Sequence, residues 1–217
     1  MKLLRLFTLL SCLLISACAS LSPSVESSHF SQADQDALAT VHVWKNEATG
    51  GLCSLVVVAP EHALTAAHCV DLMSVKGAYV LVNGKKYIPI TYKTANDKSD
   101  HAMLYVPDLP CPCAPVAKYH PLPGDSVIAI GYPYGLHKVL TRGEYQGHAK
   151  LPLDPFDPTV TEESYMVMTS AVLPGNSGGG DFVMIDNVWY LVGITSRGQG
   201  VVLLSSDVTN YKAEFKD

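Results

Sequence analysis

Apolar and polar residues follow one another in short runs along most of this chain, and these runs predict β-strands. Residues 41–44 alternate between apolar and polar positions, and residues 52–58 form a continuous apolar run that fits a buried strand. Asn83-Gly84 lies between two further runs and is the strongest short-range signal of a β-hairpin. The other predicted strands cover residues 63–65, 79–82, 86–90, 102–106, 127–130, 139–145, 165–169, 182–185, 189–194 and 201–204.

Helical signals are confined to the two ends of this strand-rich region. Ser31 is followed three residues later by Asp34, a pattern similar to a capping box, and predicts a short helix that ends near Ala39. Residues 207–215 favour a terminal helix with Ser206 as its cap.

Proline marks the irregular segments. The proline-rich residues 107–123 predict a linker between two lobes, and Pro152, Pro155 and Pro158 predict a surface loop. Many short strands with few helices indicate an all-β fold of two antiparallel barrels, the first over about residues 40–110 and the second over about residues 120–205.

The first 17 residues have the composition of an export signal. A basic start, Lys2 and Arg5, overlaps an apolar run that is too short for an ordinary membrane span. Small residues before Cys18 resemble the lipobox of bacterial lipoproteins. That resemblance implies removal of residues 1–17 and acylation of Cys18; the alternative is a plain secretory signal cut near Ala17 or Ala19.

The same resemblance predicts where the protein resides. Residues 18–30 are rich in serine and would form a flexible tether, with the globular domain over residues 31–217. Because alanine rather than aspartate follows Cys18, a Gram-negative lipoprotein of this kind would sit in the outer membrane and face the periplasm. We therefore expect a protein of the cell envelope that contacts the membrane through its lipid.

Charge excludes one class of partner. The whole chain has a formal net charge of −5, and removal of Lys2 and Arg5 leaves 13 basic against 20 acidic side chains. A mildly acidic body without a basic stripe argues against nucleic-acid binding.

The cysteines fit an oxidising compartment. Beyond Cys12 in the signal and Cys18, the pair Cys53 and Cys69 is predicted to form a disulfide. Cys111 and Cys113 are separated only by Pro112, so they are predicted to form a strained local disulfide or to stay as free thiols. Their spacing to His120 is a poor metal pattern, and we expect neither a metal site nor a cofactor.

Two short strings lie about a hundred residues apart, Thr65-Ala66-Ala67-His68-Cys69 and Gly175-Asn176-Ser177-Gly178-Gly179. They resemble the base and nucleophile segments of chymotrypsin-fold serine peptidases. The resemblance implies that His68 is the general base and Ser177 the nucleophile, on two six-stranded-type barrels with a short C-terminal helix. A serine hydroxyl needs such a base because it is a poor nucleophile at neutral pH.

A carboxylate must orient that base. Asp100-His101-Ala102-Met103-Leu104 resembles the segment that carries the orienting aspartate in this family, so Asp100 is the expected third member. Asp97, in a polar loop, is the alternative. The backbone N–H groups of Gly175 and Ser177 would form the oxyanion hole.

Within this superfamily the chain is most similar to the HtrA-type peptidases. Residues 169–177 resemble their nucleophile segment and residues 123–136 their signature at the start of the second barrel, and the likeness spans roughly residues 40–212. The chain ends soon after, so we expect no PDZ domain, and the oligomeric state stays open. Asn176 stands where trypsin-like zymogens have an aspartate, so we expect no zymogen switch of the trypsin kind.

The resemblance also implies a substrate pocket. Ala171 would lie at its base and Val172 on its wall, so basic side chains are disfavoured and small or medium aliphatic ones are expected. The strand with Thr195, Ser196 and Gly198 would pair with the substrate backbone. Arg197 would favour acidic groups further from the cut or would be a solvated edge charge.

These patterns converge on one function and one alternative. We expect an exported, lipid-anchored serine endopeptidase that cleaves protein or peptide substrates through an acyl-enzyme. The alternative is a catalytically silent lipoprotein of the same fold that binds proteins in the envelope.

Overall fold

The computed structural model describes residues 30–73, 76–96, 99–154 and 157–215. The export signal, Cys18 and the tether, as well as Asp97, lie outside the described residues. Residues 32–217 are grouped as one compact unit, separate from the preceding residues.

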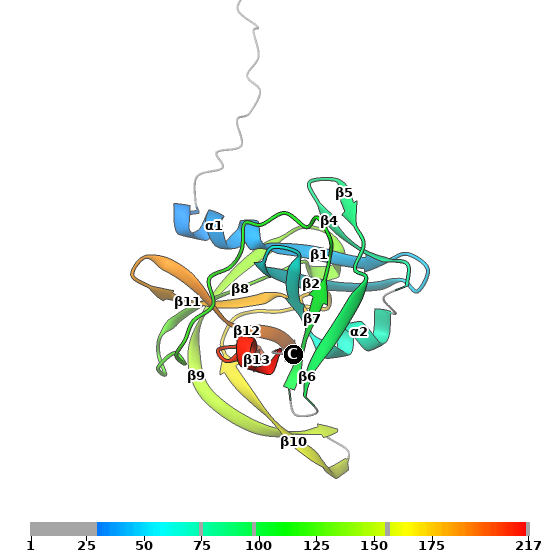
Figure 1. Ribbon diagram of the computed structural model, residues 1–217. Coiled ribbons are helices and arrows are strands. Elements are labelled where there is room, and N and C mark those ends of the chain that lie inside the picture. The colour runs from blue at the N-terminus through cyan, green and yellow to red at the C-terminus, as the bar shows by residue number, and fades with distance from the viewer. Residues whose placement is uncertain (1–29, 74–75, 97–98, 155–156, 216–217) are drawn as a thin grey trace, which may run out of the picture. The chain divides into compact units, whose positions relative to one another are not determined.

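Seven strands form an antiparallel sheet in the first half of this unit (Figure 1). Their order across the sheet is β5-β4-β1-β2-β3-β7-β6. At the β4–β5 turn Asn83 and Gly84 both have positive φ, 48° and 79°, as a type I′ hairpin turn requires, so the predicted hairpin is present. The strands are β1 (Val41–Asn46), β2 (Gly51–Ala59), β3 (His62–Thr65), β4 (Ala78–Val82), β5 (Lys85–Tyr87), β6 (Thr91–Asn96) and β7 (Ser99–Tyr105).

Six further strands close into a barrel in the order β10-β13-β12-β11-β8-β9. The fold is therefore mostly β with two barrel-like sheets, as the sequence predicts, although the first sheet has seven strands rather than six. The extra element is β6, whose polar residues carry no apolar alternation. The strands are β8 (Ser126–Gly131), β9 (Val139–Asp154), β10 (Asp157–Met168), β11 (Gly180–Ile185), β12 (Val188–Gln199) and β13 (Val202–Asp207).

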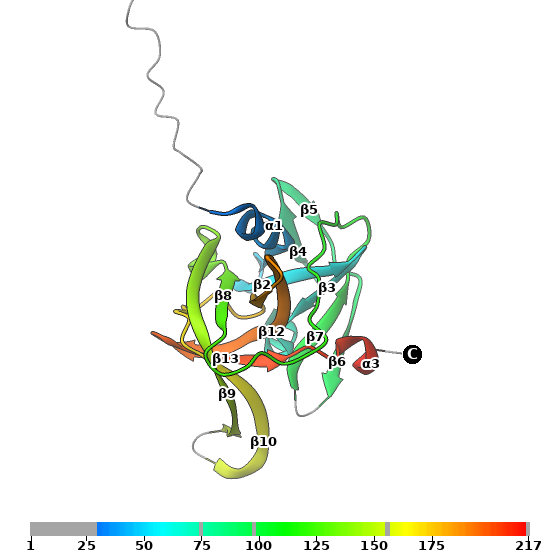
Figure 2. The same ribbon diagram turned by 90° about the vertical axis from the view of Figure 1, so that its left-hand side faces the viewer.

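The segment expected to be a proline-marked surface loop is different in the structure. β9 and β10 extend through it as a long hairpin, which projects from the rest of the unit in both ribbon views (Figures 1 and 2). Pro152 pairs with Glu162 at the far end of this hairpin, past the barrel wall, where a missing backbone donor interrupts few contacts.

The described residues contain four short helical elements beside the sheets: α1 (Gln32–Thr40), α2 (Ala67–Met73), the 3-10 turn η1 (Pro133–Gly135) and α3 (Tyr211–Glu214). The terminal helix is shorter than expected because β13 continues through Ser206, which is a strand residue and not a cap. Asn210 occupies the cap position of α3 without a side-chain hydrogen bond. α2 is an element that the strand pattern missed.

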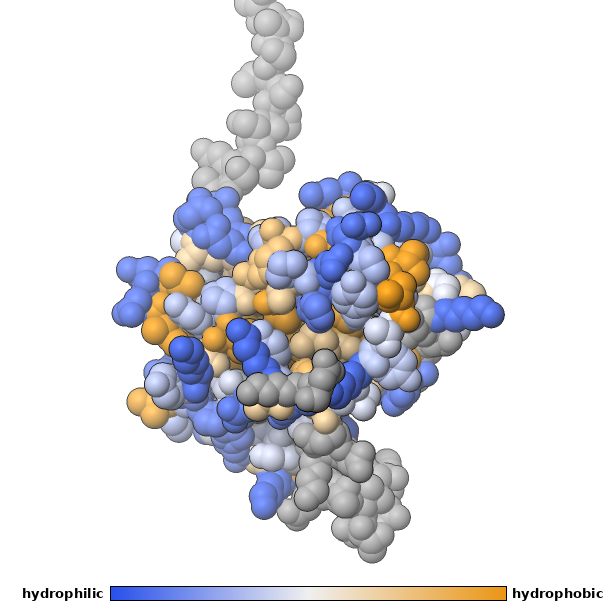
Figure 3. Space-filling model, viewed as in Figure 1, coloured by the Kyte–Doolittle hydropathy of each residue, from blue (hydrophilic) through white to orange (hydrophobic). Residues whose placement is uncertain are grey.

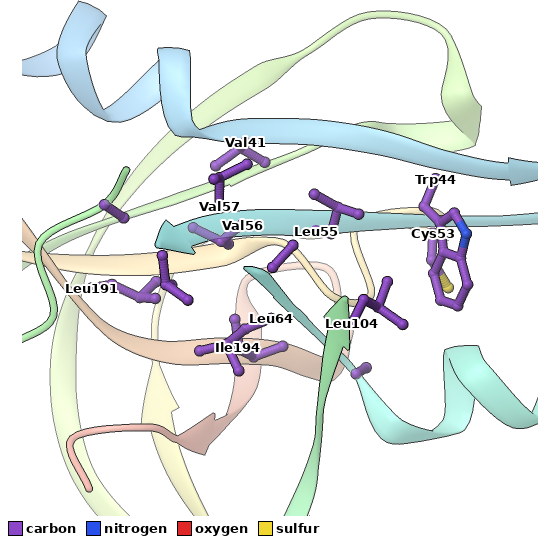
Figure 4. Close-up of a cluster of buried hydrophobic side chains, with 14 of the residues drawn as sticks. Val41, Trp44, Cys53, Leu55, Val56, Val57, Leu64, Leu104, Leu191 and Ile194 are labelled. Carbon is purple, nitrogen blue, oxygen red and sulfur yellow. The ribbon is translucent and has the colours of Figure 1, made fainter. Parts of the chain in front are cut away.

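One of the two hydrophobic clusters among the described residues spans both sheets. Leu55, Val56 and Val57 of β2 are fully buried and belong to the same cluster as Leu191 and Ile194 of β12 (Figure 4). Each buried aliphatic side chain of this kind stabilises the fold by roughly 1.5–3 kcal/mol relative to exposure. The core therefore holds the first sheet against the barrel, and loops at their junction have fixed positions.

The connecting segment between the sheets is fastened to both of them. Ala114 donates to the carbonyl of Val57 at 2.8 Å, and Ala117 donates to that of Leu191 at the same distance. Cys111 and Cys113 are joined by a disulfide in this segment. The predicted linker is thus an ordered strap along the sheets.

The surface of the unit is mixed. Apolar residues reach the surface in separate patches between hydrophilic ones on the face drawn in Figure 3. Ile88, Ile90 and Tyr92 are among the exposed apolar side chains of the described residues. No helix among the described residues is long and apolar enough to cross a membrane.

Candidate active site

His68 lies in the first turn of α2, directly after β3. The Cys53–Cys69 disulfide is present and ties this turn to β2, so the residue next to His68 is covalently fixed. The His68 side chain is 37% exposed, which leaves its ring open to a bound molecule.

Asp100, near the start of β7, holds His68 with both carboxylate oxygens. Oδ1 accepts the backbone N–H of His68 at 2.9 Å, and Oδ2 lies 2.7 Å from Nδ1 of the ring. Burial would raise the pKa of Asp100, but hydrogen bonds and the charge of His68, together with a hydrogen bond from Ser196, hold that pKa below its usual value. The carboxyl group is therefore ionised at neutral pH and keeps the imidazole in one orientation.

Ser196 of β12 connects this pair to Ser177. Its hydroxyl donates a short hydrogen bond to Asp100 Oδ2, and its carbonyl accepts the Ser177 hydroxyl at 3.5 Å. The three residues selected from the sequence thus meet around one serine of β12, although they come from different segments. Within the described part of the chain, no hydrogen bond joins Ser177 to His68, whose Nε2 lies 3.7 Å from Cys69 Sγ.

The turn around Ser177 depends on two glycines with positive φ. Gly175 has a φ of 96° and Gly178 a φ of 82°. A Cβ atom on Gly178 would come within 2.1 Å of the carbonyl oxygen of Ser54, so no other residue fits there.

Ser54 of β2 fastens this turn to the first sheet. Its N–H donates to the carbonyl of Ser177 at 2.7 Å, and its hydroxyl donates to the carbonyl of Gly175 at 2.9 Å. The same hydroxyl accepts the N–H of Tyr132 at 2.9 Å. One small side chain therefore positions the nucleophile turn and the loop after β8 together.

The backbone around Ser177 also provides donors for a developing negative charge. Gly178 and Gly179 use their N–H groups within the protein, on Thr195 and Asn176. Gly175 and Ser177 donate to no acceptor in the described residues. These are the two N–H groups expected to form the oxyanion hole.

A cavity of about 240 Å³ opens beside Ser177. The expected residues Val172, Thr195, Ser196 and Gly198 line it together with Leu173, Pro174 and Arg197. Ala171 is not among the lining residues; it is exposed, and its carbonyl accepts the hydroxyl of Thr141 at 2.9 Å.

The walls of this cavity approach each other closely. A Cβ atom on Gly198 would lie 2.3 Å from Val172 Cγ2, which means that the valine packs directly on the glycine. Arg197 next to it places its guanidinium 5.2 Å from the centre of the buried Tyr165 ring. The cavity is therefore narrow, and its lining contains no carboxylate.

Two buried polar groups lie close to the nucleophile. Asn176 is buried, and its side-chain oxygen has no hydrogen-bond partner in the described residues. Asp181 is fully buried and accepts the hydroxyl of Thr195 at 3.1 Å. Burial raises the pKa of Asp181 to about 7, since the charged form loses its water.

Sequence reasoning missed two residues of this site. Ser54 follows Cys53 in an apolar run and offers no local sign that its hydroxyl reaches the nucleophile turn. Ser196 was expected only to bind substrate, and its contact with Asp100 depends on how β12 crosses β7 in space.

Comparisons with known proteins fit this geometry. A family model described as a trypsin-like peptidase domain matches residues 53–194. Among solved structures, the active form of the protease Rv3671c from M. tuberculosis is similar, with a TM-score of 0.69 and 18% identity over 84% of this chain and 82% of that one. An inactive serine-to-alanine mutant of Rv3671c from M. tuberculosis H37Rv has the same TM-score at 19% identity, over 84% and 88% of the two chains.

A third similar solved structure is matched over a smaller share of its own chain. The serine endoprotease from Yersinia pestis has a TM-score of 0.66 and 21% identity, over 84% of this chain and 63% of that one. At these identities the likeness shows the fold. No curated protein matches the chain.

Proposed function

Because this chain belongs to the family of trypsin-like peptidases, we propose that it is an exported serine endopeptidase that cuts proteins through an acyl-enzyme on Ser177. The pairing of His68 Nδ1 with Asp100 Oδ2 at 2.7 Å carries this proposal, because it provides the oriented base that a serine nucleophile needs.

In the proposed reaction His68, Asp100 and the backbone donors have separate roles. His68 Nε2 takes the proton of the Ser177 hydroxyl as its oxygen attacks the peptide carbonyl, and Asp100 stabilises the imidazolium that forms. The oxyanion that forms accepts hydrogen bonds from the backbone N–H groups of Gly175 and Ser177. His68 then protonates the leaving amine, the C–N bond breaks, and a water activated by the same imidazole hydrolyses the ester.

The first step needs a rotation of the Ser177 side chain. Its hydroxyl now contacts the carbonyl of Ser196 at 3.5 Å, a long hydrogen bond that is easily given up. Catalytic hydrogen bonds commonly tighten only when substrate is bound. We assign this rearrangement to substrate binding.

The cavity supports the expected preference for small or medium aliphatic side chains. The packing of Val172 on Gly198 narrows the cavity, and a cationic side chain would find no carboxylate among the lining residues. Arginine or lysine would thus lose hydration without gaining an ion pair.

A peptide library tests the activity and the preference together. Wild type should cut after alanine, valine or similar residues, and Ser177→Ala should cut nothing. A clear preference for arginine or lysine would contradict the cavity argument while leaving the peptidase assignment intact.

The contact of the Ser177 hydroxyl with Ser196 instead of His68 favours a second candidate, a catalytically silent module that binds proteins. In that case wild type and Ser177→Ala would bind unfolded protein equally well, and neither would cleave it. Cleavage by wild type alone would exclude the silent module.

We also propose that Cys18 carries a lipid and anchors the protein in the envelope, outer membrane facing the periplasm in a Gram-negative cell. Metabolic labelling with a fatty acid should mark wild type and spare Cys18→Ala. Equal labelling of both chains would remove the anchor from the proposal.

A further inference from the structure

We propose that His120, His148 and Asp207 form a zinc site on the side of the barrel, separate from the serine-peptidase chemistry. One ligand atom from each side chain lies within 4.8 Å of the others. The sequence predicted no metal site, because its only candidate pattern joined His120 to Cys111 and Cys113, which are instead bonded to each other.

The three side chains come from separate segments. His120 lies in the strap between the sheets, His148 in β9 and Asp207 at the end of β13. In the barrel, β10 separates β9 from β13, and Met166 of β10 pairs with His148 on one side and with Ser205 on the other. This register brings His148 and the end of β13 to the same region of the barrel.

One ligand pair already has the spacing of a zinc site. His120 Nδ1 and Asp207 Oδ2 are 3.3 Å apart. Zinc bonds of roughly 2.0–2.2 Å in tetrahedral geometry place neighbouring ligand atoms about 3.3–3.5 Å apart. Both imidazoles are exposed, so small side-chain rotations can bring His148 to the same separation.

His148 is oriented by Tyr145, as metal-binding histidines usually are by a second group. The Tyr145 hydroxyl lies 2.7 Å from His148 Nδ1. With Nδ1–H donating to that oxygen, Nε2 keeps its lone pair for a metal. A β-bulge in β9 next to Gly147 breaks the strict alternation, which lets residues three apart meet on one face.

Asp207 is oriented in a similar way by Thr209. Its Oδ1 accepts both the backbone N–H and the hydroxyl of Thr209, each at 2.9 Å. This leaves Oδ2 for a single-oxygen contact with a cation. Two of the three ligands are therefore each held by a hydrogen-bonding group before any metal arrives, and only small rotations are needed to complete the site.

The donor set selects the metal. Two imidazole nitrogens with one carboxylate suit zinc, whereas calcium and magnesium prefer oxygen ligands. Three protein ligands leave one tetrahedral position for water or for a group from a binding partner. Next to the ligands, a cavity of about 170 Å³ lined by His148, Asp207 and Glu214 leaves room for that fourth ligand.

A metal here would fasten the strap to the barrel. Directly after the strap, the N–H of Gly124 already donates to the carbonyl of Tyr145 in β9 at 2.8 Å. A zinc ion would add a link to β13, whose Ser206 hydroxyl contacts the ring of His101, the residue after Asp100. We therefore expect the metal to stabilise the folded chain against unfolding.

Titration of zinc into the purified full chain tests the site, in a Ser177→Ala background that prevents self-cleavage. We expect one zinc per chain and a higher unfolding temperature, with no comparable effect of calcium. His120→Ala, His148→Ala and Asp207→Asn should each weaken zinc affinity at least tenfold, and Asp207→Asn keeps the acceptor for Thr209.

One control variant and one further test variant separate this site from adventitious binding. His62→Ala removes an exposed histidine on the first sheet and should leave zinc affinity unchanged. Tyr145→Phe removes the orienting hydroxyl and should weaken affinity about 10-fold or more. Absence of zinc binding, or equal binding by His148→Ala and the parent chain when both are folded, would overturn the proposal.

Discussion

The backbone N–H of Ser54 donates to the carbonyl of Ser177 at 2.7 Å, so a strand of the first sheet directly holds the nucleophile turn of the second. The Ser54 hydroxyl adds a bond to the carbonyl of Gly175, the residue that supplies one oxyanion donor. The position of this donor therefore depends on both sheets.

Ser54→Ala should impair catalysis more than folding. The change removes one hydrogen bond to Gly175 and one from Tyr132, and a hydrogen bond of this kind is worth about 0.5–1.5 kcal/mol. Loss of both bonds, about 1–3 kcal/mol together, should lower kcat/KM about 5–150-fold, with a similar secondary structure by circular dichroism. Thr49→Ala, which removes a hydroxyl from an exposed turn of the same sheet, is the control. Equal kcat/KM for Ser54→Ala and wild type would show that the hydroxyl does not position the turn.

Asp100→Asn should remove most of the activity. The amide can still accept the backbone N–H of His68 but does not stabilise an imidazolium, and a loss of roughly 10⁴ in kcat is expected for this change. Steady-state kinetics on a cleaved peptide measures it. A loss of less than tenfold would mean that another acid orients His68.

Asp100 also makes stability depend on acid pH. Its pKa is lowered in the folded chain, so its contribution is present above the pKa of the unfolded carboxyl and is lost as the pH falls through the lower folded value. Urea unfolding below pH 4 should show this loss in the parent chain and a weaker one in Asp100→Asn. Parallel curves for the two chains would contradict the assigned ionisation.

Asp181 makes stability depend on pH in the opposite direction to Asp100. Its pKa is raised to about 7, so the protonated native form is favoured and the stability contribution falls as the pH rises from about 4 to about 7. The slope from this group is about 1.4 kcal/mol per pH unit in that window. Asp181→Asn, which cannot ionise, should flatten it. An unchanged slope in Asp181→Asn would show that Asp181 is charged in the native protein.

Loss of the Cys53–Cys69 disulfide should destabilise the chain and disturb His68. The two cysteines are 16 residues apart, and closing a loop of this size contributes about 3 kcal/mol in the chain-entropy model. Replacing both by alanine should lower the free energy of unfolding by a comparable amount. The same replacement at Cys111 and Cys113, which close a far shorter loop, should cost less; an equal loss in both variants would refute the loop-length argument.

Short sequence patterns were sufficient to predict the elements whose structure is determined by neighbouring residues. The buried strand β2 and the hairpin at Asn83-Gly84 follow from apolar runs and turn chemistry. His68 and Ser177 could be assigned because their short strings resemble motifs of a known family. The glycine-rich turn alone would not show that its serine is a nucleophile.

The features that were missed depend on tertiary contacts. β6 is a polar strand that forms because β7 lies beside it, and the β9–β10 hairpin continues past Pro152 because the two strands pair with each other. The roles of Ser54 and the grouping of His148 with Asp207 depend on which strands become neighbours. No single segment of sequence contains that information.

The most direct test of the central claim is the reaction of the purified chain with a fluorophosphonate, followed by mass spectrometry of the digested protein. We expect one adduct, on the Ser177 oxygen, and its loss when His68 is replaced by alanine. An adduct on another serine, or equal labelling of Ser177 without His68, would contradict a mechanism in which this imidazole activates this hydroxyl.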